Sequence, residues 1–264
     1  MLLAEPRFPM KLWVAFTLLM LCIGSQTARA QGNKELRIAA AADLLPVMPA
    51  LADLYQKKTG VKLIVNFGSS GELETQIENG APVDLFLGAD FTFPEKVVAA
   101  GLADAKAPTA YARGRLVVWA RKDSPLQPVS IDKLTDPHAQ KIAIANQFHA
   151  PYGRAAVAAL DRMKLMDAVK NKLVTAENIA QAGEFVASGN AQVGLISLTL
   201  ATSQHYKELG SYALVPESQY PEIRQTAVVL ARSNRKAEAH AFLNWLLSSE
   251  VQGKLPNVGL EAIQ

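Results

Sequence analysis

Two adjacent serines stand between glycines where an apolar segment gives way to a helical pattern. Segment 61–67 has the apolar content of a buried strand, and the tetrapeptide Gly68–Gly71 opens a helical pattern that ends before Gly80. Such a turn leaves unpaired backbone N–H groups and the hydroxyls of Ser69 and Ser70 at the helix start. These donors can hold an anion without lysine or arginine, so the chemistry they predict is anion binding.

Three further turns of the same kind follow predicted strands. Ligands of open α/β sheets bind outside the carboxyl ends of the strands, so side chains at these turns can meet in one cleft. A Gly-Ser-rich turn alone is an ordinary helix cap, but its repetition favours an anion site. The residues at the three turns are Asp43, Tyr152 with Gly153, and Asn178 with Ile179.

The elements that must position these turns alternate between apolar strands and amphipathic helices. This alternation predicts an α/β fold with largely parallel sheets. The length suits two lobes joined by crossing segments better than one sheet or two sequential domains. We expect residues 31–120 to form the first part of lobe 1 and residues 121–225 to form lobe 2. Residues 226–264 then return to complete lobe 1.

Residues 1–30 have the features of a signal peptide. Arg7 and Lys11 give a positive start, an apolar run follows at 12–23, and Ala28–Ala30 matches an A-x-A cleavage site. We therefore expect export to the periplasm and cleavage after Ala30. A lipoprotein anchored at Cys22 is disfavoured, because the residues before this cysteine are not the small ones of a lipobox.

Composition excludes several classes of function. Cys22 is the only cysteine and leaves with the signal, so the exported chain has neither disulfide nor thiol chemistry. The net charge is +3, and residues 1–30 carry +2 of it, which leaves +1. No basic stripe with interleaved aromatics is present, so we expect no nucleic-acid partner. A soluble binding protein or a hydrolase fits this composition.

The hydrolase alternative would use Ser69 or Ser70 as nucleophile with His149 and an aspartate. The turn lacks the G-x-S-x-G pattern, and His149 falls in the other predicted lobe, so binding is favoured. The four histidines are too scattered to predict a metal cluster, and we interpret His149 as a solvated loop residue. A sensor domain is a third alternative. Arg113 and Arg115 are expected to be solvated or paired between lobes.

Several segments, in order along the exported chain, resemble the periplasmic molybdate-binding proteins of ABC importers. The resemblance implies a two-lobed type II periplasmic binding fold with an oxyanion in the cleft, no enzymatic activity and no cofactor. Its implied partners are molybdate, tungstate as a further ligand, and a membrane permease, with the receptor itself a monomer. Another oxyanion such as sulfate or phosphate remains the alternative. The segments are 36–44, 67–71, 80–90, 111–118, 150–154, 176–179 and 192–197.

The resemblance also implies which residues contact the oxyanion, with no direct metal-ion ligand among them. Ser69 is a secondary candidate, and so is Ser197, where many family members have a tyrosine that donates to the ligand. We expect this chain to use Tyr152 in its place. The implied contacts are Ala42 or Asp43, Ser70, Tyr152 and the backbone N–H of Ile179, with Asn178 capping the helix.

Asp43 departs from the serine or asparagine of many family members. A carboxylate about 4 Å from a single negative charge costs about 4 kcal/mol at an effective dielectric of 20. Its side chain can turn back as an N-cap, which we favour, or be protonated and donate. It can also accept a proton from a protonated, phosphate-like oxyanion.

Overall fold

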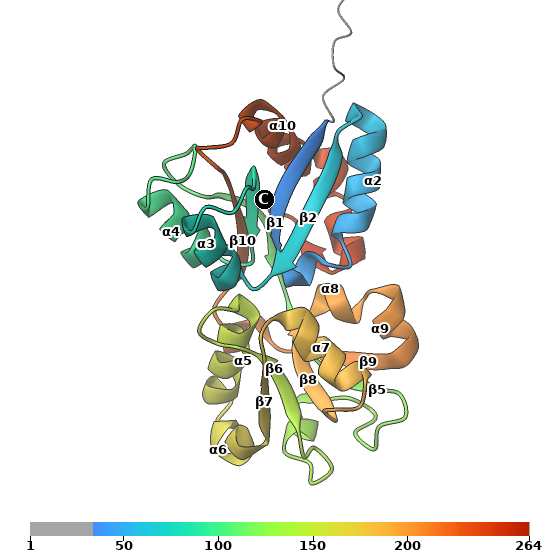
Figure 1. The fold of residues 1–264 in the computed structure, drawn as a ribbon. Helices are drawn as coiled ribbons and strands as arrows, with labels where there is room; N and C mark the ends of the chain where they lie inside the picture. The colour runs from blue at the N-terminus through green and yellow to red at the C-terminus, as the bar shows by residue number, and fades with distance from the viewer. Residues whose placement is uncertain (1–33, 264) are drawn as a thin grey trace, which may run out of the picture. The chain divides into compact units, whose positions relative to one another are not determined.

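The computed structural model describes residues 34–263, and residues 35–263 belong to one compact unit. The predicted signal peptide and its cleavage site lie outside the described residues. Two β-sheets, each with flanking helices, give the α/β two-lobed architecture expected from the sequence (Figure 1). A membrane span would need a longer and more apolar helix than any among residues 34–263.

The first lobe is built on a six-stranded sheet with strand order β11-β4-β10-β3-β1-β2. β1 is parallel to β2 and β3, whereas β10 runs antiparallel to β3 and β4, and β11 antiparallel to β4. Its strands are β1 (Glu35–Ala41), β2 (Lys62–Gly68), β3 (Leu85–Gly88), β4 (Thr109–Gly114), β10 (Ile223–Val229) and β11 (Leu260–Glu261).

Helices cover both faces of this sheet, as the alternating side chains of β1 require. Leu36 and Ile38 belong to a core shared with α2, α10 and α11, whereas Ala39 packs in the cluster formed with α3 and α4 (Figure 1). These helices are α2 (Met48–Thr59), α3 (Ser70–Glu78), α4 (Thr92–Ala99), α10 (Lys236–Leu246) and α11 (Ser249–Gln252).

The second lobe is built on a five-stranded sheet with order β7-β6-β8-β5-β9. β6 is parallel to β7 and β8, and β5 is antiparallel to β8 and β9. Its strands are β5 (Leu116–Arg121), β6 (Ile142–Ala145), β7 (Leu173–Ala176), β8 (Val193–Ser197) and β9 (Gly210–Leu214). Its helices are α5 (Pro151–Arg162), α6 (Met166–Val169), α7 (Ile179–Ala187), α8 (Leu198–Ala201) and α9 (Gln204–Leu209).

Short 3₁₀ turns complete the described chain. Of these, η1 follows β1 directly and occupies the first predicted turn of the site. The turns are η1 (Ala42–Leu44), η2 (Ile131–Leu134), η3 (Lys170–Lys172), η4 (Glu217–Gln219) and η5 (Leu255–Val258).

The sheets are mixed rather than largely parallel, because the chain changes lobes through antiparallel strands. β4 ends at Gly114 in the first sheet and β5 begins at Leu116 in the second, so the crossing is at Arg115. It therefore precedes the expected boundary at 120. The return follows β9, and β10 rejoins the first sheet from Ile223. The apolar run of β5 predicts a strand but does not say in which sheet it pairs.

Two helix starts bear on the site. α5 begins at Pro151, which puts Tyr152 in its first turn. A proline at the first helical position is compatible with helix, which explains this start. At the start of α4 the Asp90 carboxylate accepts the N–H of Phe93 at 3.2 Å.

Candidate functional site

The four predicted turns meet in one small pocket between the two lobes. It receives residues from the ends of β1 and β2 and from the starts of α5 and α7, all at carboxyl ends of parallel strands. Among its lining residues are Ala42, Asp43, Ser69, Ser70, Tyr152, Asn178 and Ile179. The structure thus brings together every primary site residue suggested by the sequence.

The serines at the start of α3 have different roles. Ser69 is the N-cap: its hydroxyl accepts the N–H of Glu72 at 3.3 Å and donates to the Glu72 carboxylate at 2.8 Å. Ser70 is fully buried, and its hydroxyl oxygen accepts the N–H of Ala89 at 3.0 Å. Ser69 is therefore occupied by capping, whereas the hydroxyl proton of Ser70 can be donated into the pocket.

Two helices of the second lobe begin at the pocket. Tyr152 lies in the first turn of α5, and Ile179 is the first residue of α7. Asn178 caps α7 as predicted, accepting the N–H of Gln181 at 3.0 Å. The first N–H groups of a helix have no intrahelical partner, so these two starts present donors toward the pocket.

The Asp43 carboxylate is fully buried and faces the second lobe. Its Oδ2 accepts the hydroxyl of Tyr152 at 3.2 Å and the side-chain amide of Gln225. Its Oδ1 is buried without a hydrogen-bond partner among residues 34–263. Burial raises the pKa of Asp43 to about 7, although the hydrogen bonds from Gln225 and Tyr152 oppose this shift.

This position of Asp43 corrects our expectation that its side chain is an N-cap. The residue lies inside the single turn η1, whose N-cap is Ala41, and η1 has no side-chain cap. A residue within the first turn is already past the position from which a side chain caps. The carboxylate is instead directed across the pocket, which the sequence did not reveal.

Tyr111 and Gln225 form a buried support for Asp43. The Tyr111 hydroxyl donates to the Gln225 carbonyl oxygen at 2.7 Å and lies 3.3 Å from the carbonyl of Gly88. This bond orients the Gln225 amide so that its NH₂ faces Asp43. A Cβ on Gly114 would lie 2.1 Å from the Tyr152 hydroxyl, so only glycine leaves room for that hydroxyl.

Ser197 lies outside the pocket lining. It is the N-cap of α8, where its hydroxyl accepts the N–H of Leu200 at 3.3 Å and lies 2.8 Å from the Thr199 hydroxyl. Thr199 in turn donates to the backbone carbonyl of Asp43 at 2.7 Å. Ser197 is therefore connected to the site only through Thr199, which holds the backbone of Asp43.

His149 is not a solvated loop residue, as the sequence suggested, but a half-buried contact between lobes. Its Nδ1 lies 3.1 Å from the Ser69 hydroxyl, and its backbone carbonyl accepts the N–H of Gly71 at 2.8 Å. A Cβ on Gly71 would lie 2.5 Å from the His149 Cβ. Sequence patterns do not show which loops meet across a cleft, so this contact was missed.

The Ser69–His149 pair does not have the geometry of a hydrolytic site. In a Ser-His-acid triad the nucleophile is free and approaches Nε2, while the acid holds Nδ1. Here the Ser69 hydroxyl approaches Nδ1 and is bonded to Glu72, and Nε2 lies 3.7 Å from the exposed Glu177.

Glu72, His149 and Glu177 each have an atom within 4.8 Å of the others and could hold a cation, although Glu72 already serves as a cap.

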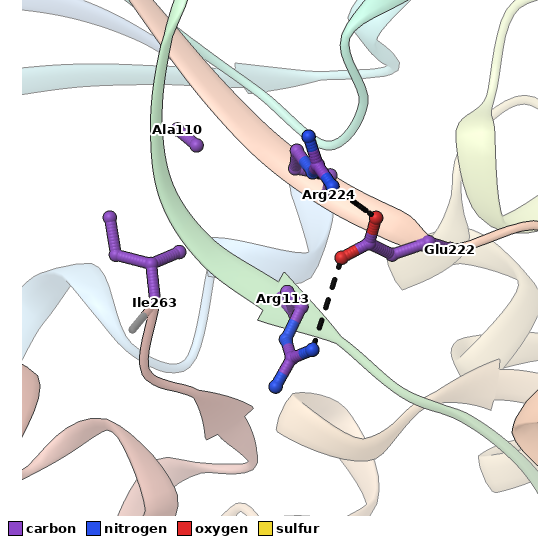
Figure 2. Close-up of a pocket in the computed structure, with 5 residues that line it drawn as sticks. All are labelled: Ala110, Arg113, Glu222, Arg224 and Ile263. Atoms are coloured by element: carbon purple, nitrogen blue, oxygen red, sulfur yellow. Dashed lines mark hydrogen bonds and ion pairs between the residues drawn. The ribbon is translucent and has the colours of Figure 1, made fainter.

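A larger pocket of about 350 Å³ lies on β4 and β10, away from the four turns. Figure 2 shows Arg113 and Arg224 directed at the same Glu222 carboxylate, at 4.0 and 2.7 Å. Arg113 also lies 3.4 Å from Glu261. Both cations are therefore paired, and Arg113, which was expected to be solvated or paired between lobes, has its partners in or beside strands of its own sheet.

Comparisons with known proteins agree with this fold. A family model described as bacterial extracellular solute-binding protein matches residues 36–261. The molybdate-binding protein ModA of Azotobacter vinelandii is 40% identical over 218 residues, covering 80% of this chain and 84% of the relative. ModA of Rhodobacter capsulatus is 35% identical over 244 residues, covering 92% and 94%.

A solved structure also matches the fold of this chain. The Azotobacter vinelandii periplasmic molybdate-binding protein matches with a TM-score of 0.81 and 32% identity, covering 87% of this chain and 100% of that chain. These relatives are solute-binding proteins and not enzymes. By its family match and its identity over most of its length, the chain belongs to the bacterial extracellular solute-binding proteins, in the group of the molybdate-binding proteins.

Proposed function

We propose that this protein is the periplasmic receptor of an ABC importer for molybdate, with tungstate as a second ligand. The observation that carries the proposal is the pocket at the four turns, where helix starts and Ser70 gather without a lysine or arginine in the lining. Neutral donors fixed by the fold can hold a tetrahedral dianion. The relatives with 35–40% identity are named for molybdate binding, which supports this choice of anion.

The donors that we assign come from both lobes. Ser70 supplies its hydroxyl, and the N–H groups of Ala42, Tyr152 and Ile179 lie at the starts of η1, α5 and α7. The Tyr152 hydroxyl supports Asp43 rather than the ligand. These residues bind oxygen atoms of the anion, and none is a direct ligand of a metal ion. Each donor to a charged acceptor contributes about 1.5–3 kcal/mol.

The mechanism of capture is closure of the lobes around the anion. Contacts that cross between lobes include the Gly71 N–H to the His149 carbonyl at 2.8 Å and Thr199 to the Asp43 carbonyl at 2.7 Å. They form only when the two halves of the pocket meet, so they favour the closed form. The closed monomer then docks on the membrane permease and releases its ligand, without a cofactor.

Export is part of the same proposal. The positive start, apolar run and A-x-A site of residues 1–30 direct the chain to the periplasm, with cleavage after Ala30. The folded receptor then comprises lobe 1 from residue 31, lobe 2, and the return segment that carries β10 and α10. A receptor outside the cytoplasm is the component that an importer of scarce oxyanions needs.

Calorimetry of the protein purified after export tests the proposal, with molybdate, tungstate, sulfate and phosphate as separate titrants. We expect sub-micromolar binding of molybdate and tungstate and at least about 100-fold weaker binding of the other two anions. Tight binding of phosphate or sulfate alone would show that the receptor is specific for that anion and not for molybdate. No binding of any of the four would reject the oxyanion receptor.

A further inference from the structure

Asp43 lines the anion pocket and has one buried carboxylate oxygen without a hydrogen-bond partner among residues 34–263. Its side chain is 0% exposed, and Oδ1 has no hydrogen-bond partner among residues 34–263. The residue lines the pocket together with Ser70 and Ile179. A buried polar atom without a partner is rare in folded proteins and calls for an explanation.

An ionised Asp43 would be incompatible with the proposed ligand. Two like charges within a few ångströms strongly disfavour ionisation of both, and no lysine or arginine lines the pocket to offset them. Arg154, two residues after Tyr152 on α5, is already paired with Asp90. Tyr111 and Tyr152 face Asp43, and burial raises the pKa of both phenols well above the usual range, so neither is charged near neutrality.

The hydrogen bonds around Asp43 indicate where a proton would be. Oδ2 accepts from both Tyr152 and Gln225 and is filled by donors. In this arrangement Tyr111 donates to the Gln225 carbonyl oxygen at 2.7 Å, and this bond keeps the Gln225 NH₂ directed at Asp43. This arrangement leaves Oδ1, the oxygen without a hydrogen-bond partner among residues 34–263, as the site for a carboxyl proton.

Building on the proposed function, we propose that Asp43 binds the oxyanion as the neutral acid, its Oδ1–H donating to an oxygen of the anion. Each dianion then enters the pocket together with one proton, taken from solvent whenever the free protein holds a carboxylate. No bond of the anion is made or broken. The receptor becomes a proton-coupled binder in which one side chain is both a donor and a sensor of pH.

The direction of the pH effect follows from linkage. In the free protein burial raises the pKa of Asp43 to about 7, and the bound dianion raises the pKa further. Well below this pKa the acid is already neutral, so affinity is independent of pH. Above it each binding event must take up a proton, and the dissociation constant rises about tenfold per pH unit.

The test is calorimetry with molybdate at about pH 8 in buffers of different ionisation enthalpy, which measures the protons taken up. The wild-type protein should take up close to one proton per anion and lose affinity from about pH 7 to about pH 9. Asp43→Asn donates from an amide without titrating, so its proton uptake and its loss of affinity with pH should disappear. Ser70→Ala is the control: its affinity should drop at every pH while proton uptake persists.

Infrared difference spectroscopy locates the proton. Molybdate added to the wild-type protein at about pH 8 should produce a protonated-carboxyl C=O band that Asp43→Asn lacks. Proton uptake without that band would put the proton on the anion and overturn the inference. Wild-type binding with no proton uptake would also overturn it while leaving the receptor function intact. Absence of molybdate binding would instead reject the receptor function itself.

Discussion

Two pockets in the described part of the chain differ in how their charge is arranged. The pocket on β4 and β10 is the larger and contains two arginines, but Glu222 pairs with both (Figure 2). The pocket between the lobes is small and has no lysine or arginine in its lining, and its proposed donors are helix starts and the Ser70 hydroxyl, which are fixed in place.

The comparison shows that the presence of charged side chains does not by itself make an anion site, because the donors must also be unpaired and directed at the ligand. An arginine that is half exposed and paired must break its ion pair before it can serve a ligand. A helix start needs no such rearrangement, because its N–H groups are already unpaired and directed outward. We therefore expect binding to depend on the neutral pocket, and substitutions in each pocket measure that dependence.

The largest expected effect concerns Asp43, whose side chain is the one carboxyl group in the lining of the inter-lobe pocket. The pKa of Asp43 is about 7 in the folded state against 3.8 ordinarily, so the folded state retains a proton that the unfolded state releases. The free energy of unfolding therefore falls as pH rises from about 4 to about 7, and it stays constant above that as far as this group is concerned. The total decrease due to Asp43 is up to about 4 kcal/mol. Asp43→Asn removes this loss.

Thermal unfolding without ligand measures the effect. Asp43→Asn should be more stable than the wild-type protein at about pH 8, with the difference vanishing toward about pH 4. Asp53→Asn is the control, since Asp53 is exposed and pairs only with Lys57 on the same helix. Equal stability of Asp43→Asn and wild type at both pH values would mean that Asp43 is not destabilised by burial.

The next largest effect tests whether the neutral pocket must close. A Cβ at position 71 would lie 2.5 Å from the His149 Cβ across the cleft. Overpacking of this kind costs about 1–3 kcal/mol, so Gly71→Val should weaken molybdate binding by roughly 5- to 150-fold. Calorimetry gives the affinity, and circular dichroism of the free protein checks that the lobes still fold.

Gly71→Ala provides the graded comparison for this prediction, because its smaller side chain should give an intermediate loss. An affinity for Gly71→Val within about threefold of wild type would show that the His149 contact is not required for binding.

Local chemistry explains which parts of the site the sequence predicted. The start of α3, with its Ser69 cap, and the Asn178 cap of α7 are formed by residues a few positions apart, so their types and spacing suffice. The pattern of turns also named Tyr152, the family resemblance added Ala42, and the structure places both in the pocket.

The contacts that were missed join residues far apart in the chain. Asp43 meets Tyr152 109 positions later and Gln225 182 positions later, and no periodicity links them. A polar residue within the buried strand β10 was the only available signal for Gln225, and it does not specify a partner. Mixed strand order was missed for the same reason, since pairing is set by the tertiary structure.

A moderate effect is expected from removing a single neutral donor. Ser70→Ala deletes a hydroxyl whose oxygen is held by Ala89 and whose proton is free to reach the anion. The lost donor should weaken molybdate binding by about 1–3 kcal/mol, or roughly 5- to 150-fold. Calorimetry at a fixed pH measures this loss.

Ser233→Ala is the matched control for Ser70. Its hydroxyl is partly buried and donates to Asp84 at 2.6 Å, but it does not line the inter-lobe pocket. We expect Ser233→Ala to retain wild-type affinity. Equal affinities for both variants would remove Ser70 from the set of donors.

The smallest effect is expected in the pocket that has the cations. Arg224→Gln removes the arginine closest to Glu222 (Figure 2), an ion pair whose side chains are 55% and 43% exposed. Exposed pairs of this kind contribute at most about 1 kcal/mol, and Arg113 remains to neutralise Glu222. Molybdate affinity measured by calorimetry should stay within about twofold of wild type, and the melting temperature should shift by no more than a few degrees. A tenfold loss of affinity would mean that the anion uses the paired arginines, and the distinction between the two pockets would then fail.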